Sequence, residues 1–297
     1  MRVETAVNSY FSARRTLIDQ HLDGIRLAAS APAVLTGPLS EAITSPGKRI
    51  RALLLLTVGE AFGGRCDRLL DAAAAFEMIH SSSLILDDLP AMDDAELRRG
   101  KPALHRSFGE DLAILSAVAL LNHAYGLIAA NHAAMNPRRW PLKVLIDRVV
   151  AAVGWDGTIG GEAVDLHSES ARLDFETLEY IHSRKTGALF VAAASSGAIL
   201  ANAPESSVRS IEAYAKNLGL AFQITDDILD VTATAEAIGK DVGKDVDKLT
   251  FVKLAGVDGA RQLSVELTAT SIAAIQSLGG AASHLRELAE MVRDRVR

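Results

Sequence analysis

The sequence predicts an all-α protein. Alanine and leucine are abundant, aromatic residues make up only 5 %, and no run of Val, Ile or Thr alternates with polar residues at the period of two typical of a strand. After Pro141 the only remaining proline is Pro204, so long helices can form in the second half of the chain. These observations favour a single domain over residues 1–297, because helices joined by short connections bury their apolar stripes only against one another.

The expected helices are defined by apolar residues at helical spacing and by the breaks between them. The last helix shows this spacing clearly, because Leu285, Leu288 and Val292 form one apolar stripe. The breaks contain glycine, proline or clustered charge and fall at residues 45–47, 98–102, 136–137 and 239–248. We expect helices over residues 3–30, 48–62, 67–89, 107–133, 141–160, 174–184, 186–202, 206–231, 249–274 and 280–296.

The composition excludes several classes of function. The 31 basic and 37 acidic residues give a formal charge of −6, which argues against a nucleic-acid-binding protein because phosphate backbones require a basic surface. Cys66 is the only cysteine, so a disulfide framework and a cysteine-built zinc site are excluded. The first residues do not contain the apolar core of a signal peptide, and no stretch approaches the roughly 18 apolar residues of a membrane span. We therefore expect a soluble, cytoplasmic protein with no membrane span.

Two acidic clusters follow apolar helical segments. The first extends from Asp87 to Asp94, and Pro90 should end the helix just beyond its first two aspartates. In the second, a spacing of four residues places two aspartates on one helix face. Carboxylates on apolar helices are costly unless cations meet them, so two such clusters favour a hard cation such as Mg²⁺ over a pair of solvated helix ends. The candidate metal ligands are Asp87, Asp88, Asp93, Asp226, Asp227 and Asp230.

Basic residues accompany both acidic clusters. Lys48, Arg49 and Arg51 open an expected helix, where backbone N–H groups also favour an anion. The other basic residues lie near the aspartates or follow them. Any one of these cations alone is most simply a solvated surface charge. Their arrangement predicts a diphosphate held by Mg²⁺ on one side and by basic side chains on the other. The basic residues concerned are Lys48, Arg49, Arg51, Arg98, Arg99, Lys185, Lys240, Lys244 and Lys248.

The order of these motifs resembles that of the trans-isoprenyl diphosphate synthases, the polyprenyl synthetase family. The resemblance rests on Gly-Lys-Arg-Ile-Arg at 47–51, Glu-Met-Ile-His at 77–80, the first aspartate motif, Leu-Arg-Arg-Gly-Lys-Pro at 97–102, Lys-Thr at 185–186 and Phe-Gln-x-x-Asp-Asp-x-x-Asp at 222–230. Segments 83–88 and 111–121 are most similar to bacterial geranylgeranyl diphosphate synthases of carotenoid pathways. The resemblance implies the isoprenoid synthase fold, a bundle of about ten or more helices around a central cavity, and a homodimer.

The resemblance also implies a reaction. The family condenses isopentenyl diphosphate with an allylic partner, namely dimethylallyl, geranyl or farnesyl diphosphate. Mg²⁺ held by both aspartate clusters would bind the allylic diphosphate, its C–O bond would ionise, and isopentenyl diphosphate would attack the allylic cation. Such a site must stabilise the leaving diphosphate and exclude water. The six candidate carboxylates carry −6 together, which three Mg²⁺ ions would balance. Without metal, like charges ~4 Å apart would cost ~4 kcal/mol per pair at an effective dielectric constant of 20.

The resemblance further implies roles for individual residues. Thr186 and Gln223 would lie beside the developing cation. His80 could be a buried core histidine, but its position seven residues before Asp87, on the same helix face, favours a place in the site. The residues expected to bind isopentenyl diphosphate are Lys48, Arg51, His80 and Arg99, and Arg49 is a further candidate for substrate binding. Those expected to bind the allylic diphosphate are Arg98, Lys185, Lys240 and Lys248. Those expected to take part in catalysis are Asp87, Asp88, Arg98, Lys185, Thr186, Gln223 and Asp226.

Product length is expected to be set on the helix before the first acidic cluster. A helix rises 1.5 Å per residue, so Ile79, Ser82 and Ser83 should lie deeper than Asp87. Short-chain members of the family carry a bulky aromatic residue at the position of Ser82 or Ser83. Serine leaves room, and we expect the C20 product geranylgeranyl diphosphate. The C15 product farnesyl diphosphate is the alternative. A terpene cyclase or a non-catalytic regulatory subunit are alternatives of other classes, which the two intact acidic clusters disfavour.

Three positions depart from the pattern of the family. Leu86 stands where histidine is frequent, and Leu249 replaces the small residue that commonly follows Lys248. Glu162 stands where glutamine is usual, which leaves the role of this glutamate open. The glycine-rich segment 157–161 is not preceded by the strand of a dinucleotide-binding loop, and we interpret it as a helix-breaking or helix-packing site.

Overall fold

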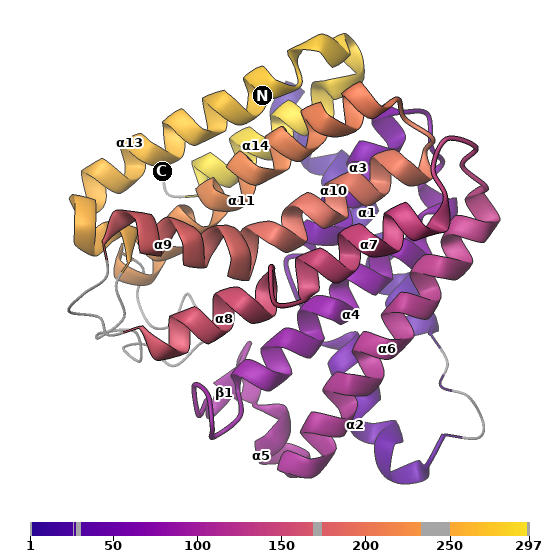
Figure 1. Cartoon of the computed structure of the whole chain (residues 1–297), viewed down its shortest axis with the longest axis vertical. Coiled ribbons are helices and arrows are strands. Elements are labelled where there is room, and N and C mark those ends of the chain that lie inside the picture. Colours follow the sequence, from indigo (N-terminus) through magenta and orange to yellow (C-terminus); the bar gives the residue numbers. More distant parts are fainter. Residues whose placement is uncertain (1, 26, 28–30, 169–173, 233–249, 296–297) are drawn as a thin grey trace.

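The computed structural model describes residues 2–25, 27, 31–168, 174–232 and 250–295, and over these ranges the protein is all-α, as predicted (Figure 1). The short elements are η1 (Cys66–Arg68), η3 (Ser183–Gly187), η4 (Gln276–Ala282) and a small antiparallel hairpin of β1 (Leu97–Arg98) and β2 (Lys101–Pro102). The α-helices are α1 (Arg2–Gly24), α2 (Ala33–Thr44), α3 (Ile50–Ala61), α4 (Leu70–Asp87), α5 (Leu104–Phe108), α6 (Glu110–Met135), α7 (Leu142–Val153), α8 (Thr158–His167), α9 (Phe175–His182), α10 (Ala188–Leu200), α11 (Glu205–Thr232), α13 (Phe251–Ala274) and α14 (Ser283–Asp294).

The core is organised around α10. This helix is buried on nearly all sides and contacts α3, α4 and α11. Glycine allows it to approach α3 closely, because a Cβ at Gly197 would lie 2.3 Å from the carbonyl oxygen of Leu55. The helices that carry the two acidic clusters, α4 and α11, therefore both pack on one central helix, which holds them in a fixed relation.

Several helix boundaries differ from the prediction. The expected helix over 3–30 ends at Gly24, and a separate helix follows at Ala33–Thr44, where Pro32 and Pro38 disguise the helical pattern. The expected helix over 141–160 is two helices, α7 and α8. The chain breaks before Gly157, where a Cβ would lie only 2.1 Å from the carbonyl oxygen of Ala152. Local backbone requirements, which periodicity alone does not reveal, explain these differences.

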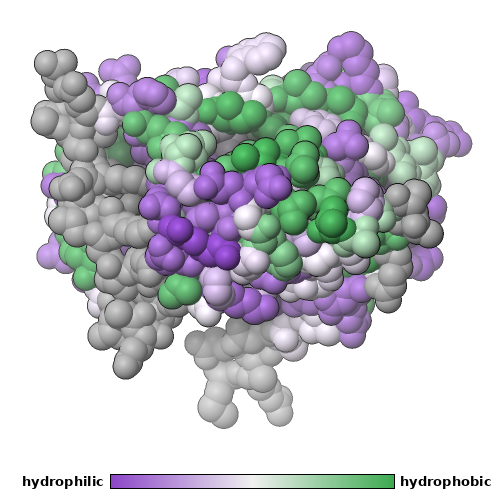
Figure 2. All heavy atoms as spheres, turned by 90° about the horizontal axis from the view of Figure 1, so that it is seen from below, coloured by the Kyte–Doolittle hydropathy of each residue, from purple (hydrophilic) through white to green (hydrophobic). Residues whose placement is uncertain are grey.

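The long helix α6 has two apolar faces. One is buried in the core, whereas Ile114, Leu115 and Val118 on the other are 42 to 57 % exposed. Among the described residues, α6 is the one helix long and apolar enough to cross a membrane by length and composition, although apolar helices of soluble proteins meet the same test. The expectation that no stretch qualifies as a span is therefore not confirmed. Figure 2 views the end of the molecule at which α2, α5 and the first turns of α6 lie, and it shows apolar surface interrupted by polar groups.

Candidate active site

The first acidic cluster lies at the carboxy-terminal end of α4. The helix ends at Asp87 and the chain folds back, because Asp93 N donates to the carbonyl oxygen of Asp87 at 2.9 Å. The Asp88 carboxylate is buried and accepts hydrogen bonds from the guanidinium of Arg98 on β1. Burial, and then the negative charge of Glu162, raise the pKa of Asp87 to about 7. One aspartate is thus matched by an arginine, while its neighbour is poorly stabilised as an anion.

The second acidic cluster lies near the carboxy-terminal end of α11. The Asp227 carboxylate accepts hydrogen bonds from Gln223 Nε2 at 3.0 Å and from Phe251 N at 3.1 Å. Burial nevertheless raises the pKa of Asp227 to about 6. Asp226 Oδ1 lies 2.7 Å from Arg295 Nη2 and 3.3 Å from Lys48 Nζ. Asp226, the first aspartate of this motif, is therefore paired with one cation that precedes α3 and another that follows α14.

A third group of charges is centred on Lys185, in the π-type turn between α9 and α10. Such turns frequently occur at functional sites. Lys185 Nζ lies 2.6 Å from Glu162 Oε2 and 2.7 Å from Asp165 Oδ2, both on α8. Burial opposes the charge of Lys185, but the two carboxylates outweigh it and raise the pKa of this lysine. The ammonium ion is therefore held firmly in its charged form.

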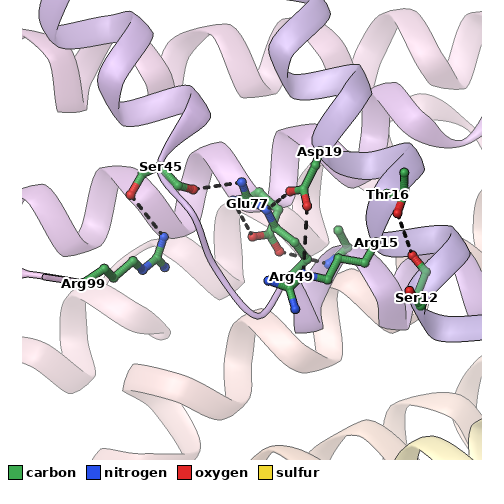
Figure 3. Close-up of polar contacts among 9 residues, drawn as sticks. Ser12, Arg15, Thr16, Asp19, Ser45, Arg49, Glu77 and Arg99 are labelled. Atoms are coloured by element: carbon green, nitrogen blue, oxygen red, sulfur yellow. Dashed lines mark hydrogen bonds and ion pairs between the residues drawn. The ribbon is translucent and has the colours of Figure 1, made fainter. Parts of the chain in front are cut away.

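Arginines form the opposite side of the site. Figure 3 shows the Arg49 guanidinium directed into the protein, where it lies 2.7 Å from Asp19 Oδ1, 2.8 Å from the Ser45 carbonyl oxygen and 3.6 Å from Glu77 Oε2. The Arg49 side chain is only 3 % exposed. Its donor groups are occupied within the protein, so the geometry gives Arg49 a supporting position in this loop. In the same view Arg99 reaches Ser45 from the hairpin, at 3.5 Å between Nη1 and Oγ.

Arg51 and His80 lie on the inner side of this arginine group. Arg51 is 8 % exposed, lies over the Phe190 ring at 5.2 Å, and its Nε has no hydrogen-bond partner within the described part of the chain. Burial lowers its pKa to about 10. Burial, followed by the charge of Arg51 and other arginines, holds the pKa of His80 well below its usual range. A neutral imidazole thus stands among guanidinium ions, and this cationic group is suited to a polyanion.

Two chains of interactions connect the acidic clusters. The first chain starts at Asp87, which lies within the electrostatic influence of Lys185. Thr186, the residue after Lys185, donates its hydroxyl hydrogen to Gln223 Oε1 at 3.0 Å. Gln223 in turn donates a hydrogen bond to Asp227. In the second chain, Arg51 lies within the influence of both Asp226 and Arg99, and Arg99 within that of Asp88. These interactions therefore link four of the predicted carboxylates with three of the predicted cations, namely Asp87, Asp88, Asp226 and Asp227 with Arg51, Arg99 and Lys185.

The donor set suits a hard divalent cation. In the described part of the chain, no three His, Cys, Asp or Glu side chains converge closely enough to hold a metal ion by themselves. However, the carboxylates are oxygen donors of the kind Mg²⁺ prefers. Asp87 and Asp227 have raised pKa values, which shows that their anionic forms need further positive charge. The residues fit a cation that also takes ligands from a diphosphate.

Some candidate residues lie elsewhere or outside the described ranges. Lys240, Lys244 and Lys248 belong to the segment 233–249, which is outside the described residues. Ile79 is buried, Ser82 donates its hydroxyl hydrogen to the Ala117 carbonyl oxygen of α6 at 2.9 Å, and Ser83 donates to the His80 carbonyl oxygen of its own helix. The product-length candidates therefore lie beneath Asp87 on α4, with Ser82 directed at α6.

Sequence reasoning did not identify three residues that the site uses. Glu77 accepts a hydrogen bond from Ala52 N and pairs with Arg49, so it supports the arginine group. Asp165 shares Lys185 with Glu162. Arg295 lies close to the end of the chain, far from any motif, and the stacking of its guanidinium over Phe222 at 4.9 Å gives no signal in the sequence. Glu77 lies within the motif at 77–80, but its partners only became apparent in the fold.

The sequence of residues 32–276 matches the family model described as polyprenyl synthetase. The chain belongs to this family. It is 42 % identical over 253 residues to a geranylgeranyl diphosphate synthase of Cyanophora paradoxa, covering 84 % of this chain and 83 % of that one. It is 39 % identical over 267 residues to a farnesyl diphosphate synthase of Geobacillus stearothermophilus, covering 88 % and 87 %.

A solved structure supports the same assignment. The crystal structure of a geranyltransferase from Helicobacter pylori, complexed with magnesium and isoprenyl diphosphate, superposes with a TM-score of 0.82 at 28 % identity, over 96 % of this chain and 95 % of that one. This member of the polyprenyl synthetase family is therefore a prenyltransferase. Relatives of similar identity bear the names of synthases with different products, so family membership leaves the product length open.

Proposed function

We propose that this prenyltransferase is a Mg²⁺-dependent geranylgeranyl diphosphate synthase, which condenses isopentenyl diphosphate with an allylic diphosphate to form the C20 product. One observation supports the proposal: cations approach both carboxylate clusters, Lys48 at Asp226 and Arg98 at Asp88. In addition, Thr186 and Gln223 link the Lys185 turn to Asp227. A metal-bridged diphosphate needs this combination of oxygen ligands and Arg or Lys donors. In this proposal three Mg²⁺ ions balance the six aspartates.

Each side of the site has a distinct task in the proposed reaction. Lys48, Arg51, Arg99 and neutral His80 bind isopentenyl diphosphate, with Arg49 fixing their loop from inside. Arg98 and Lys185 bind the allylic diphosphate. When bound at the aspartates, Mg²⁺ supplies positive charge that stabilises the departing diphosphate.

The oxygen atoms near the reacting carbon are oriented before substrate binds. The Gln223 amide donates to Asp227 and accepts from Thr186, so its oxygen is fixed toward Thr186. In the proposed reaction, the Thr186 hydroxyl oxygen and the Gln223 amide oxygen stabilise the developing allylic cation. The double bond of isopentenyl diphosphate attacks this cation, and a proton is lost to complete the chain extension.

We base the C20 product on the small side chains below Asp87. Ser82 is 3 % exposed and donates a hydrogen bond to the Ala117 carbonyl oxygen of α6, and in this proposal its small side chain leaves the growing chain room to extend past this level. Ser82→Phe should shift the product from C20 toward C15 farnesyl diphosphate, whereas Ser82→Ala, which removes only the hydroxyl, should retain C20. An unchanged product in Ser82→Phe would refute this assignment of the floor. A farnesyl diphosphate synthase is the alternative, because a relative at 39 % identity bears that name.

The exposed face of α6 supports two further parts of the proposal. Ile114, Leu115 and Val118 form an apolar strip whose burial against a second copy would make the homodimer expected of this family. The same burial would account for the apolar composition of α6 without a membrane span, in a cytoplasmic enzyme. Sedimentation equilibrium of the wild type and of Val118→Glu tests the dimer, which the charged variant should weaken.

Product analysis tests the proposed function directly. The protein is incubated with isopentenyl diphosphate, Mg²⁺ and either dimethylallyl, geranyl or farnesyl diphosphate, and the product chain length is measured by mass spectrometry. C20 as the end product supports the proposal, whereas C15 from dimethylallyl and geranyl diphosphate with no extension of farnesyl diphosphate would replace it by the farnesyl alternative. Condensation with none of the primers would instead favour a terpene cyclase or a regulatory subunit.

A further inference from the structure

Glu162 occupies a position whose role the sequence leaves open. It lies on α8, one residue after Gly161, and α8 meets the Lys185 turn at backbone contact. A Cβ at Gly161 would lie 2.4 Å from Lys185 N, so only glycine permits this approach. The contact sets Glu162 Oε2 at 2.6 Å from Lys185 Nζ. The position of this carboxylate is thus fixed by the packing of two backbone segments.

The second oxygen of Glu162 is buried without a hydrogen-bond partner. The residue is 7 % exposed, and Oε1 has no partner within the described part of the chain. A buried carboxylate oxygen in this state is costly unless positive charge lies nearby. Of the charged groups that shift the pKa of Asp87, Glu162 has the largest effect. The Glu162 carboxylate therefore lies on the side of the site that faces the first acidic cluster.

A charge count shows what this arrangement favours. Asp87, Glu162 and Asp165 contribute −3 when ionised, and Lys185 contributes +1. The net charge of −2 would be balanced by one divalent cation. Glutamine at position 162 would leave only −1. Because no three acidic side chains converge into a metal cage in the described ranges, Glu162 acts through its charge and through Lys185 and Asp87.

We propose that Glu162 is a positioning residue of the metal site, whose negative charge increases the affinity of the Asp87 side for a divalent cation before any diphosphate binds. This inference rests on the proposed function for the role of Asp87 as a metal ligand. It assigns to the glutamate a task that the neutral glutamine usual at this position does not perform. Its hydrogen bond to Lys185 could be made by either side chain, so the charge is the distinguishing property.

Glu162→Gln separates charge from hydrogen bonding. Mn²⁺ binding to the substrate-free protein is measured by electron paramagnetic resonance, with Mn²⁺ as the probe for Mg²⁺. We expect Glu162→Gln to weaken the tightest Mn²⁺ site on the order of tenfold, as is typical when a group behind a metal ligand is changed. Glu212→Gln is the matched control, because Glu212 lies in the first half of α11, pairs with Arg148 of α7 and should not affect Mn²⁺ binding. Unchanged affinity in Glu162→Gln would overturn the proposal and leave the glutamate a structural partner of Lys185.

A second variant changes the charge in the opposite direction. Lys185→Met removes the positive charge that competes with the cation, so it should bind Mn²⁺ more tightly than the wild type in the absence of substrate. Unchanged or weaker binding would overturn the proposal, even if Glu162→Gln failed to fold. A wild type that binds no Mn²⁺ without substrate would do the same. The proposed function is judged separately by the wild-type condensation assay, so condensation combined with an unresponsive Mn²⁺ site would refute this inference alone.

Discussion

Asp87→Asn tests whether the candidate metal site is maintained at the expense of stability. Asp87 is largely buried, and burial together with the charge of Glu162 raises its pKa to about 7. Asparagine has nearly the same shape but no charge. In metal-free buffer at high pH, the variant should therefore be more stable than the wild type, although it loses a proposed metal ligand.

The magnitude follows from the pKa shift of Asp87. Its pKa rises from an ordinary value of 3.8 to about 7, and each pKa unit corresponds to about 1.4 kcal/mol. At pH 8 the ionised carboxylate thus destabilises the folded state by about 4 kcal/mol. Because the folded state holds the proton more tightly than the unfolded state, this cost diminishes as the pH falls, to about 2 kcal/mol at pH 5. The advantage of Asp87→Asn should diminish in parallel.

Urea denaturation in the presence of EDTA at pH 8 and pH 5 measures this difference. The neighbouring substitution Asp88→Ala is the control of opposite sign, because Asp88 is buried and hydrogen-bonded to Arg98. It should lower the free energy of unfolding by about 2 kcal/mol. If Asp87→Asn were no more stable than the wild type at pH 8, or if its advantage did not change with pH, the electrostatic reasoning about this site would be wrong.

Three further predictions concern the surroundings of the site. Arg295→Ala should strengthen Mn²⁺ binding to the substrate-free protein, because Arg295 competes for Asp226; isothermal titration calorimetry measures this, and unchanged affinity would contradict it. Gly161→Ala should lower the free energy of unfolding by about 1–3 kcal/mol, because the added Cβ would meet the backbone nitrogen of Lys185. Gly126→Ala, on an open part of α6, should instead raise the free energy of unfolding by about 0.5–1 kcal/mol. Equal effects of the two substitutions in urea denaturation would refute this. Burial lowers the pKa of His182 to about 4, so the unfolded state binds a proton at this histidine more readily than the folded state does. Between pH 6.5 and pH 4 the wild type should therefore lose about 3 kcal/mol of its free energy of unfolding relative to His182→Gln. Parallel pH profiles of stability for the two proteins would contradict this prediction.

The sequence allowed prediction of the fold class because helical periodicity depends on local spacing. The helices that carry the acidic clusters, α4 and α11, end or begin within a few residues of their expected bounds. The break between α7 and α8 was harder to foresee, because it depends on how the chain packs at Gly157 and not on composition. The close approach of α8 to Lys185 likewise depends on a contact between segments more than twenty residues apart.

The residues of the candidate site could be predicted where sequence motifs contain them. The orientation of their side chains could not be predicted where it depends on neighbouring helices. The aspartates stand on helix ends that periodicity could locate. In contrast, the sequence could not indicate that Arg49 turns inward, because this depends on Glu77 and Asp19 from two other helices. Nor could it indicate that Arg295 reaches Asp226 across 69 positions of sequence. Charge pattern identifies the members of such a site, but packing decides which of them face a ligand.

Backbone strain accompanies the cationic side of the site for a physical reason. Arg49 has φ 54° and Arg99 has φ 56°, and such a left-handed conformation costs a non-glycine residue about 1 kcal/mol or more. Arg49 stands directly before α3, so the turn there sends Lys48 toward Asp226 and the guanidinium of Arg49 toward Glu77. Glycine at position 49 would relieve the strain but would remove the guanidinium that fixes the loop from inside. The left-handed conformation of Arg49 therefore allows two adjacent cations to point in different directions. Lys48 points toward the acidic cluster of α11, and Arg49 points toward Glu77 in the interior of the protein.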